Sequence, residues 1–114
     1  MRRDLERLQD VIEAIDRIQQ QATGDRAAFD GNPLVQVWVV HHLEIIGEAC
    51  RGLSAELRGR HPAVPWAAII GMRNILIHDY FGLNLDEVWA AVERDVPALR
   101  QQVLAILEEE VSSQ

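Results

Sequence analysis

The sequence is poor in the residues that build disulfides, metal centres and folds rich in turns. Cys50 is the only cysteine among 114 residues, which excludes an intrachain disulfide and a zinc site built from cysteines. The seven glycines, four prolines, three Trp, two Phe and one Tyr are too few for a β-fold with many tight turns. No apolar run is long enough to cross a membrane, and the N-terminus lacks a signal-peptide pattern. We therefore expect one soluble cytoplasmic domain over residues 1–114.

Lysine is absent altogether. All 11 basic residues are arginines, and they face 18 acidic residues, which gives a net charge of −7. This balance disfavours a broad basic surface that holds nucleic acid by charge alone, but it leaves room for a small local site. Arginine is then the one permanent cation that the chain offers to a phosphate.

Apolar residues recur at helical spacing in four segments, and these predict an all-α, antiparallel bundle of four to five helices. The first helix spans about residues 3–22. The second spans 34–57 after the cap Asn32-Pro33, and its first two turns are apolar nearly all round, which predicts the most buried helix. The third spans 65–78. The fourth starts after Asn84 with a capping-box pattern, and Pro97 should kink it or split it near residues 93–97.

A polar stripe runs along the second predicted helix. His41, Glu44, Glu48 and Arg51 follow one another at spacings of three, four and three residues. One interpretation is a solvent-facing side with a Glu48–Arg51 ion pair, and the other is a stripe that faces a cleft or a dimer seam. The neighbouring His42 points elsewhere, because adjacent helical residues do not share a face. The stripe is a weak metal-site pattern, so we expect neither a metal nor another cofactor.

Several smaller expectations follow from single residues. Cys50 and the three tryptophans (Trp38, Trp66 and Trp89) are predicted core residues. Gly47 and Gly71 lie inside predicted helices, where each costs about 1 kcal/mol against alanine. This predicts the close approach of another helix, from the same bundle or from a second chain. The acidic residues 108–110 predict a frayed, solvated helix end.

The densest polar cluster in an apolar setting closes the third predicted helix. Arg73 and Asn74 are followed by His78, Asp79 and Tyr80. Arg73 and His78 are five residues apart, so they flank a groove or meet where the helix loosens. The negative end of the helix dipole favours protonated His78 and Arg73 opposes it, a balance that suits acid–base chemistry near neutral pH. The structural alternative is that these side chains merely satisfy carbonyls at the helix end.

The spacing Arg73-x4-His78-x-Tyr80 resembles the RX4HXY signature of the HEPN superfamily, in its HepT toxin branch. The surrounding residues are similar as well, and the similarity covers nearly the whole chain. They are Leu43-Glu44-Ile45-Ile46-Gly47-Glu48-Ala49, Pro65-Trp66, Gly71-Met72-Arg73-Asn74, His78-Asp79-Tyr80-Phe81-Gly82, Val88-Trp89 and Asp95-Val96-Pro97-Ala98-Leu99.

The resemblance implies a homodimeric helical bundle and a ribonuclease toxin that works without a metal ion. Its site would form where two copies of the motif meet, with Arg73 and His78 as catalytic residues and Asn74 and Asp79 in support. The implied partners are RNA and a minimal nucleotidyltransferase antitoxin, which transfers AMP from ATP onto Tyr80 and silences the toxin. The alternative is a non-catalytic module that binds a nucleotide or a partner within a nucleotidyltransferase complex.

Overall fold

The computed structural model describes residues 2–78 and 84–112, with the backbone alone for residues 2 and 73–78. The described elements are α1 (Arg2–Gln21), α2 (Arg26–Asp30), α3 (Pro33–Arg51), α4 (Ala55–Arg60), α5 (Trp66–His78), α6 (Leu85–Ala90), the π-helical segment η1 (Ala91–Asp95) and α7 (Val96–Ser112). Within these ranges the chain forms helices and connections without a strand, which confirms the predicted all-α class. None of the described helices combines the length and the apolar character needed to cross a membrane.

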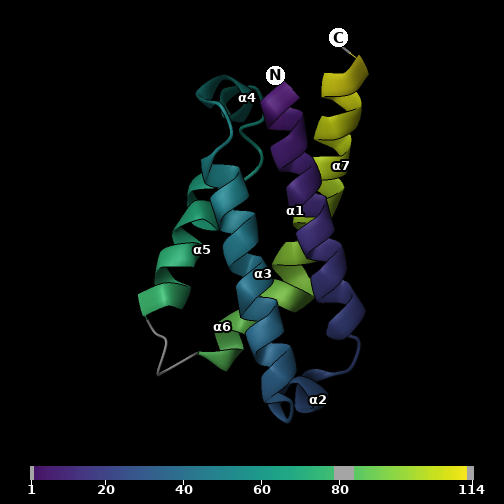
Figure 1. Ribbon diagram of the computed structural model, residues 1–114, viewed down its shortest axis with the longest axis vertical. Coiled ribbons are helices and arrows are strands. Elements are labelled where there is room, and N and C mark those ends of the chain that lie inside the picture. The colour runs from purple at the N-terminus through teal and green to yellow at the C-terminus, as the bar shows by residue number, and fades with distance from the viewer. Residues whose placement is uncertain (1, 79–83, 113–114) are drawn as a thin grey trace.

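The long helices alternate in direction and form an antiparallel bundle. In Figure 1, α1 runs down from the N-terminus, α3 runs up beside it, and α5 runs down on the other side of α3. Helix α7 returns upward behind α1, so the described ends of the chain lie at the same end of the bundle. The α1–α3 and α3–α5 pairs are the most extensive contacts, and they place α3 between its two neighbours.

The core is built from one stripe of each long helix. Leu8, Val11, Ile15 and Ile18 of α1 are fully buried, whereas Gln19, four residues after Ile15, is exposed. The stripe of α1 packs on apolar residues of α3 and α7, and Phe29, Leu57, Trp66 and Val88 close the core at its ends. The buried residues of α3 and α7 include Val39, Leu43, Ile46, Cys50, Val96, Leu99, Val103 and Ile106.

The second predicted helix was too long at its C-terminal end. It stops at Arg51, and a separate helix α4 begins at Ala55 instead of the predicted continuation to residue 57. Ser54 makes the restart: its Oγ accepts a hydrogen bond from Leu57 N at 3.1 Å. Asp4 of α1 accepts from Ser54 N at 2.9 Å and from Ser54 Oγ at 2.7 Å, so a buried carboxylate fixes the start of α4 to α1.

The second predicted helix is buried along its later turns, from Val39 to Cys50, and not along the apolar first turns on which the prediction rested. Leu34 is 83% exposed and Val37 is 64% exposed, although both belong to the apolar start of α3. Trp38 is also partly exposed, and its indole Nε1 donates to Arg17 O at 3.0 Å instead of entering the core. The other two tryptophans are closer to prediction, since Trp66 is buried and Trp89 packs against the core beside Phe29.

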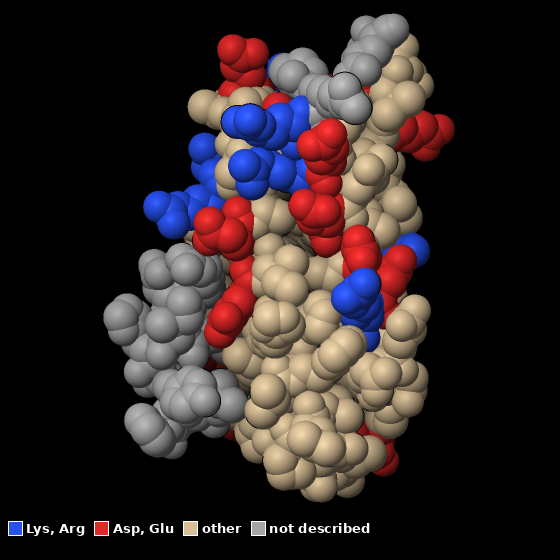
Figure 2. All heavy atoms as spheres, viewed as in Figure 1, with Lys and Arg blue, Asp and Glu red and all other residues tan. Residues whose placement is uncertain are grey.

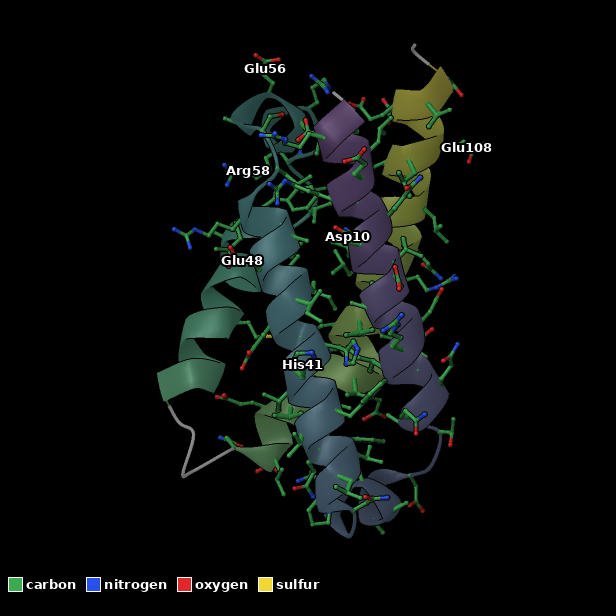
Figure 3. The ribbon with its side chains drawn as sticks, in the orientation of Figure 1. Asp10, His41, Glu48, Glu56, Arg58 and Glu108 are labelled. Carbon is green, nitrogen blue, oxygen red and sulfur yellow. The ribbon has the colours of Figure 1, made fainter. Side chains whose placement is uncertain are left out.

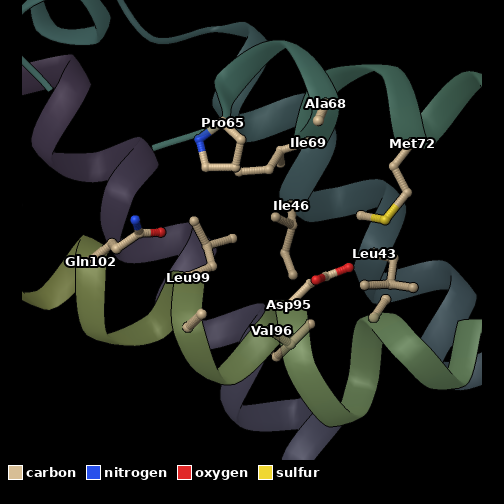
Figure 4. Close-up of a pocket in the computed structure, with 12 residues that line it drawn as sticks. Leu43, Ile46, Pro65, Ala68, Ile69, Met72, Asp95, Val96, Leu99 and Gln102 are labelled. Carbon is tan, nitrogen blue, oxygen red and sulfur yellow. The ribbon is translucent and has the colours of Figure 1, made fainter. Parts of the chain in front are cut away.

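Pro97 alters the fourth predicted helix as expected, in the form of a π-helical segment. The chain passes from α6 into η1 over Ala91–Asp95 and then into α7, which begins one residue before the proline. Proline has no N–H to donate to the carbonyl four residues earlier, and a wider turn accommodates that missing bond. Asp95, the last residue of this segment, lines a cavity together with residues of α3 and α5, as Figure 4 shows.

The acidic end of α7 is ordered, which corrects our expectation of a frayed terminus. The helix continues to Ser112, and Glu110 is 8% exposed. Its carboxylate forms an ion pair with Arg60 of α4, and His61 Nε2 lies 3.8 Å from the same group. The pairing explains why an acidic residue is buried here, because α4 supplies the cation.

Cys50 is a fully buried core residue, as predicted. Burial raises the pKa of its thiol from an ordinary value of 9.0 to about 12, and the charge of Arg58 opposes part of that rise. At pH 8 we expect a thiol reagent to label the folded chain at least about 10²-fold more slowly than the urea-unfolded chain, because the thiolate is the reactive form. Equal rates in both states would contradict this burial.

The same pKa shift predicts a pH dependence of stability. Below pH 9 the thiol is protonated in the folded and the unfolded chain, so its contribution to the free energy of unfolding is fully present. As the pH rises from 9 to about 12, the unfolded chain ionises first and this contribution is lost. In a Cys50→Ala variant, the free energy of unfolding, measured by urea denaturation between pH 9 and 12, should fall less than in the wild-type chain.

Candidate functional site

Helix α5 carries the first half of the predicted motif. Its backbone stays helical through His78, so Arg73, Asn74 and His78 belong to one uninterrupted helix. In an ideal helix the Cα atoms of Arg73 and His78 are then ~7.5 Å apart along the axis and ~140° apart around it. The side chains of these three residues, and Asp79 and Tyr80 entirely, lie outside the described residues.

The chain is anchored again directly after residues 79–83. Asn84 caps α6, with its Oδ1 accepting from Asp86 N at 3.0 Å and from Glu87 N at 3.3 Å. This confirms the predicted cap. Arg26 of α2 donates to Asp30 at 2.8 Å and to Asp86 at 2.6 Å, which ties the start of α6 to α2. The hydrogen bond to Asp30, followed by that to Asp86, raises the pKa of Arg26. The described chain that follows the motif is therefore fixed to the bundle.

A cavity of about 350 Å³ lies beside α5, one turn ahead of the motif (Figure 4). Its wall is apolar apart from Asp95 and Gln102, and Met72, the residue before Arg73, forms part of it. Its described lining offers no cation to a phosphate, so it suits an apolar group better than a nucleotide's charged backbone. The lining comes from α3, α5, η1, α7 and the residue before α5: Leu43, Ile46, Pro65, Ala68, Ile69, Met72, Ala91, Asp95, Val96, Ala98, Leu99 and Gln102.

Of the predicted stripe on α3, only Glu48 lines one of the described pockets, and a role of the stripe at a cleft or a dimer seam stays a prediction. His41, Glu48 and Arg51 are exposed and Glu44 is half-buried, and His41 and Glu48 are labelled on α3 in Figure 3. No ion pair joins Glu48 to Arg51 among the described side chains, although Glu48 does have an interaction partner. The described residues also contain no group of three His, Cys, Asp or Glu that could hold a metal ion.

A polar groove of about 340 Å³ between α1 and α3 was not predicted. Its wall combines the charged residues Arg7, Asp10, Glu13, Arg17 and Glu48 with Ala14, Ala49, Ile45 and the buried His42. The His42 Nδ1 lies 2.8 Å from Trp38 O, and the ring stacks against Trp38 at a centroid distance of 4.4 Å. His42 is buried and His41 is exposed, as expected, although the two rings meet edge to face at a centroid distance of 5.1 Å. Its contacts give it a packing role, which a sequence pattern does not reveal.

Comparison with known proteins gives one consistent family. Residues 8–106 match the family model described as "Ribonuclease HepT-like". A Methanocaldococcus jannaschii protein named "Putative RNase" is 40% identical over 97 residues, which are 84% of this chain and 89% of that protein. A Caldanaerobacter subterraneus protein with the same description is 44% identical over 82 residues, 72% of this chain and 73% of the relative.

A third relative carries the more specific name. The "Probable ribonuclease HepT" of Thermococcus cleftensis is 34% identical over 96 residues, which cover 82% of this chain and 86% of that protein. No solved structure matches the chain.

Proposed function

Because the chain belongs to the HepT-like ribonuclease family, we propose that it is a toxin that cleaves RNA without a metal ion. The observation that carries the proposal is the placement of Arg73 and His78 on one helix, at one end of a bundle of this family. Each chain brings one such arginine and one such histidine. The reaction needs two proton-transfer groups, so we propose a cytoplasmic homodimer of single-domain chains whose two motifs form one site.

The proposed reaction is an attack by the RNA on itself. One His78 takes the proton from the ribose 2′-OH, and the 2′-oxygen forms a bond to the neighbouring phosphorus. The bond from phosphorus to the 5′-oxygen breaks, and the partner's His78 gives its proton to that leaving oxygen. The products are a 2′,3′-cyclic phosphate and a free 5′-OH. Arg73 binds the phosphate oxygens and stabilises the added negative charge, and Asn74 donates to the phosphate or orients His78.

The proposed control acts on Tyr80, the only tyrosine. A minimal nucleotidyltransferase antitoxin would join the Tyr80 hydroxyl oxygen to the α-phosphorus of ATP, with pyrophosphate as the leaving group. The attached AMP would add bulk and negative charge two residues from His78. RNA phosphates would then be excluded by sterics and by repulsion.

Gly71 supports the pairing of two chains through α5. A Cβ atom at this position would meet nothing within 4 Å in the same chain, so the close neighbour that we expected is absent from the described part of the bundle. The open position lies two residues before Arg73, on the helix that carries the motif. A helix of a second copy could approach closely there, which is the alternative that our sequence analysis left open.

Mixed dimers test the shared site directly. We would refold wild-type chain with increasing amounts of a His78→Ala variant and measure RNA cleavage against the wild-type fraction. One site that needs both histidines predicts activity that follows the square of the fraction, about one quarter of full activity in an equal mixture. Two independent sites predict about one half. A linear dependence would contradict the composite site.

A further inference from the structure

The arginines of this acidic chain divide into two groups by their partners. Of the nine whose side chains are described, five form ion pairs: Arg17 with Glu13, Arg26 with Asp30 and Asp86, Arg60 with Glu110, Arg94 with Asp95, and Arg100 with Asp16. The other four are Arg3, Arg7, Arg51 and Arg58, and none of them forms an ion pair or a side-chain hydrogen bond with a described residue. We call these four the arginine patch.

The arginine patch is confined to one end of the bundle. Arg3 and Arg7 lie one turn apart near the start of α1, Arg51 is the last residue of α3, and Arg58 belongs to α4. Figure 2 shows the basic side chains gathered over the upper part of the molecule, where these three elements meet in Figure 1. Figure 3 labels Arg58 in the same region.

Local contacts hold the patch together. The Arg7 guanidinium lies against Gly52, directly after Arg51, and a Cβ atom on Gly52 would overlap it. Arg58 acts electrostatically on the thiol of Cys50, the residue before Arg51. The Nε atoms of Arg7 and Arg58 are buried without a hydrogen-bond partner, so the stems of both side chains are fixed in partly desolvated positions. A guanidinium held in this way binds an anion more strongly than a mobile, fully hydrated one.

Folding alone does not account for the patch. Arg51 complements the negative end of α3, but Arg3 stands in the first turn of α1, where a positive charge opposes the helix dipole. Among the nearby acidic groups, both Asp4 oxygens are engaged by Ser54. Asp10 and Glu48 line the same groove as Arg7, but no ion pair joins a described carboxylate to any of the four patch arginines. Arginines without an ion-pair partner among the described residues, in a chain of net charge −7, point to an external anion.

We infer that the arginine patch binds the phosphate backbone of the RNA strand, outside the cleavage site. The inference rests on the proposed function for its substrate class. Helix α5 leads from this end of the bundle to the motif, and its 13 residues rise about 18 Å from Trp66 to His78. A strand of a few nucleotides spans that length. The patch would add affinity without reading sequence, while the acidic remainder of the surface repels RNA elsewhere.

Binding of an uncleavable RNA separates this inference from catalysis. The probe is a fluorescent single-stranded oligonucleotide of about 12 nucleotides with 2′-O-methyl riboses, which cannot attack their phosphates. We compare Arg51→Gln/Arg58→Gln with Arg17→Gln/Arg94→Gln, a control that removes the same charge from paired, exposed arginines. Circular dichroism and thermal unfolding check that both variants fold.

The patch variant should bind about 10-fold or more weakly at low salt. The slope of log affinity against log salt should fall by about 1.4, because each lost phosphate contact on a single strand contributes about 0.7. The control should match wild type. Equal losses of affinity in the patch variant and the control would overturn the inference. Unchanged binding in the patch variant would overturn it as well, and would leave an acidic protein surface as the ligand of the patch. If the wild-type chain binds the oligonucleotide but cleaves no RNA, and the patch variant loses this binding, the inference holds and the proposed function is refuted.

If the variant Arg51→Gln/Arg58→Gln does not fold, Arg3→Gln/Arg51→Gln replaces it. Both of those side chains are exposed, so their loss leaves no buried group unsatisfied. The same loss of affinity and of salt dependence is expected, and wild-type binding by this folded variant would equally overturn the inference.

Discussion

RNA cleavage by a His78→Ala variant should fall by at least about 10⁴-fold relative to the wild-type chain. The substitution removes both proton-transfer groups of a shared site, and each such group typically contributes 10²–10⁴. Binding of uncleavable RNA should change far less, because Arg73 and the arginine patch remain. The measurement is the initial rate of cleavage of a labelled RNA, with helix content and thermal unfolding recorded on the same preparation.

Rescue by imidazole distinguishes a catalytic role of His78 from a structural one. If the lost group is an acid or a base, free imidazole in the buffer should restore part of the activity of the His78→Ala variant and leave wild-type activity unchanged. A folded variant that cleaves RNA at the wild-type rate would remove His78 from the site, and the motif would then do no more than complete the end of α5.

A Tyr80→Phe variant should escape control by the antitoxin completely. Phenylalanine keeps the ring and removes the hydroxyl oxygen that would accept AMP. After incubation with the nucleotidyltransferase and ATP, wild-type cleavage should drop to background and its intact mass should rise by AMP, whereas the variant should keep its rate and its mass. Incubation without ATP is the matched control.

The contrary result for Tyr80 is equally informative. If the partner silences the Tyr80→Phe variant without adding mass, inhibition comes from binding. Such a result would favour the alternative in which this chain is a binding module of a nucleotidyltransferase complex. Mass added to the Phe variant would instead show that AMP goes to another residue.

Features set by neighbouring residues in the sequence could be predicted well. Asn84 caps α6, Asn32 accepts from Val35 N at 3.2 Å at the start of α3, and Pro97 follows the π-helical segment. Each depends on a side chain and a backbone group a few positions away. The attachment of the start of α4 was missed because it depends on Asp4, which is 50 residues from the Ser54 that it holds.

Exposure and charge pairing could not be read from the sequence for the same reason. The spacing of Leu34 and Val37 predicts a helix, but it does not predict which other helices pack against it. The bundle leaves the start of α3 uncovered, so both side chains are exposed. The Arg60–Glu110 pair joins residues 50 positions apart. The contrast between paired arginines and the arginine patch therefore emerges only when the helices are assembled.

The candidate site was visible in the sequence because its spacing is local. Arg73 and His78 lie five positions apart, and the continuous backbone of α5 preserves that relation in the fold. The stripe of His41, Glu44, Glu48 and Arg51 was as regular in sequence. In the structure these residues lie on one helix, with Glu44 half-buried and the other three exposed, and a shared role at a cleft or a dimer seam stays a prediction.

The most direct test is cleavage of total cellular RNA by the chain purified without its partner, in the presence of a metal chelator. Intact mass first establishes that Tyr80 is unmodified, and the His78→Ala variant is assayed beside it. The account predicts that the wild-type chain cleaves RNA in chelator and that the variant does not. An unmodified, folded dimer that leaves RNA intact, or that cleaves it only when divalent metal is restored, would contradict a metal-independent ribonuclease.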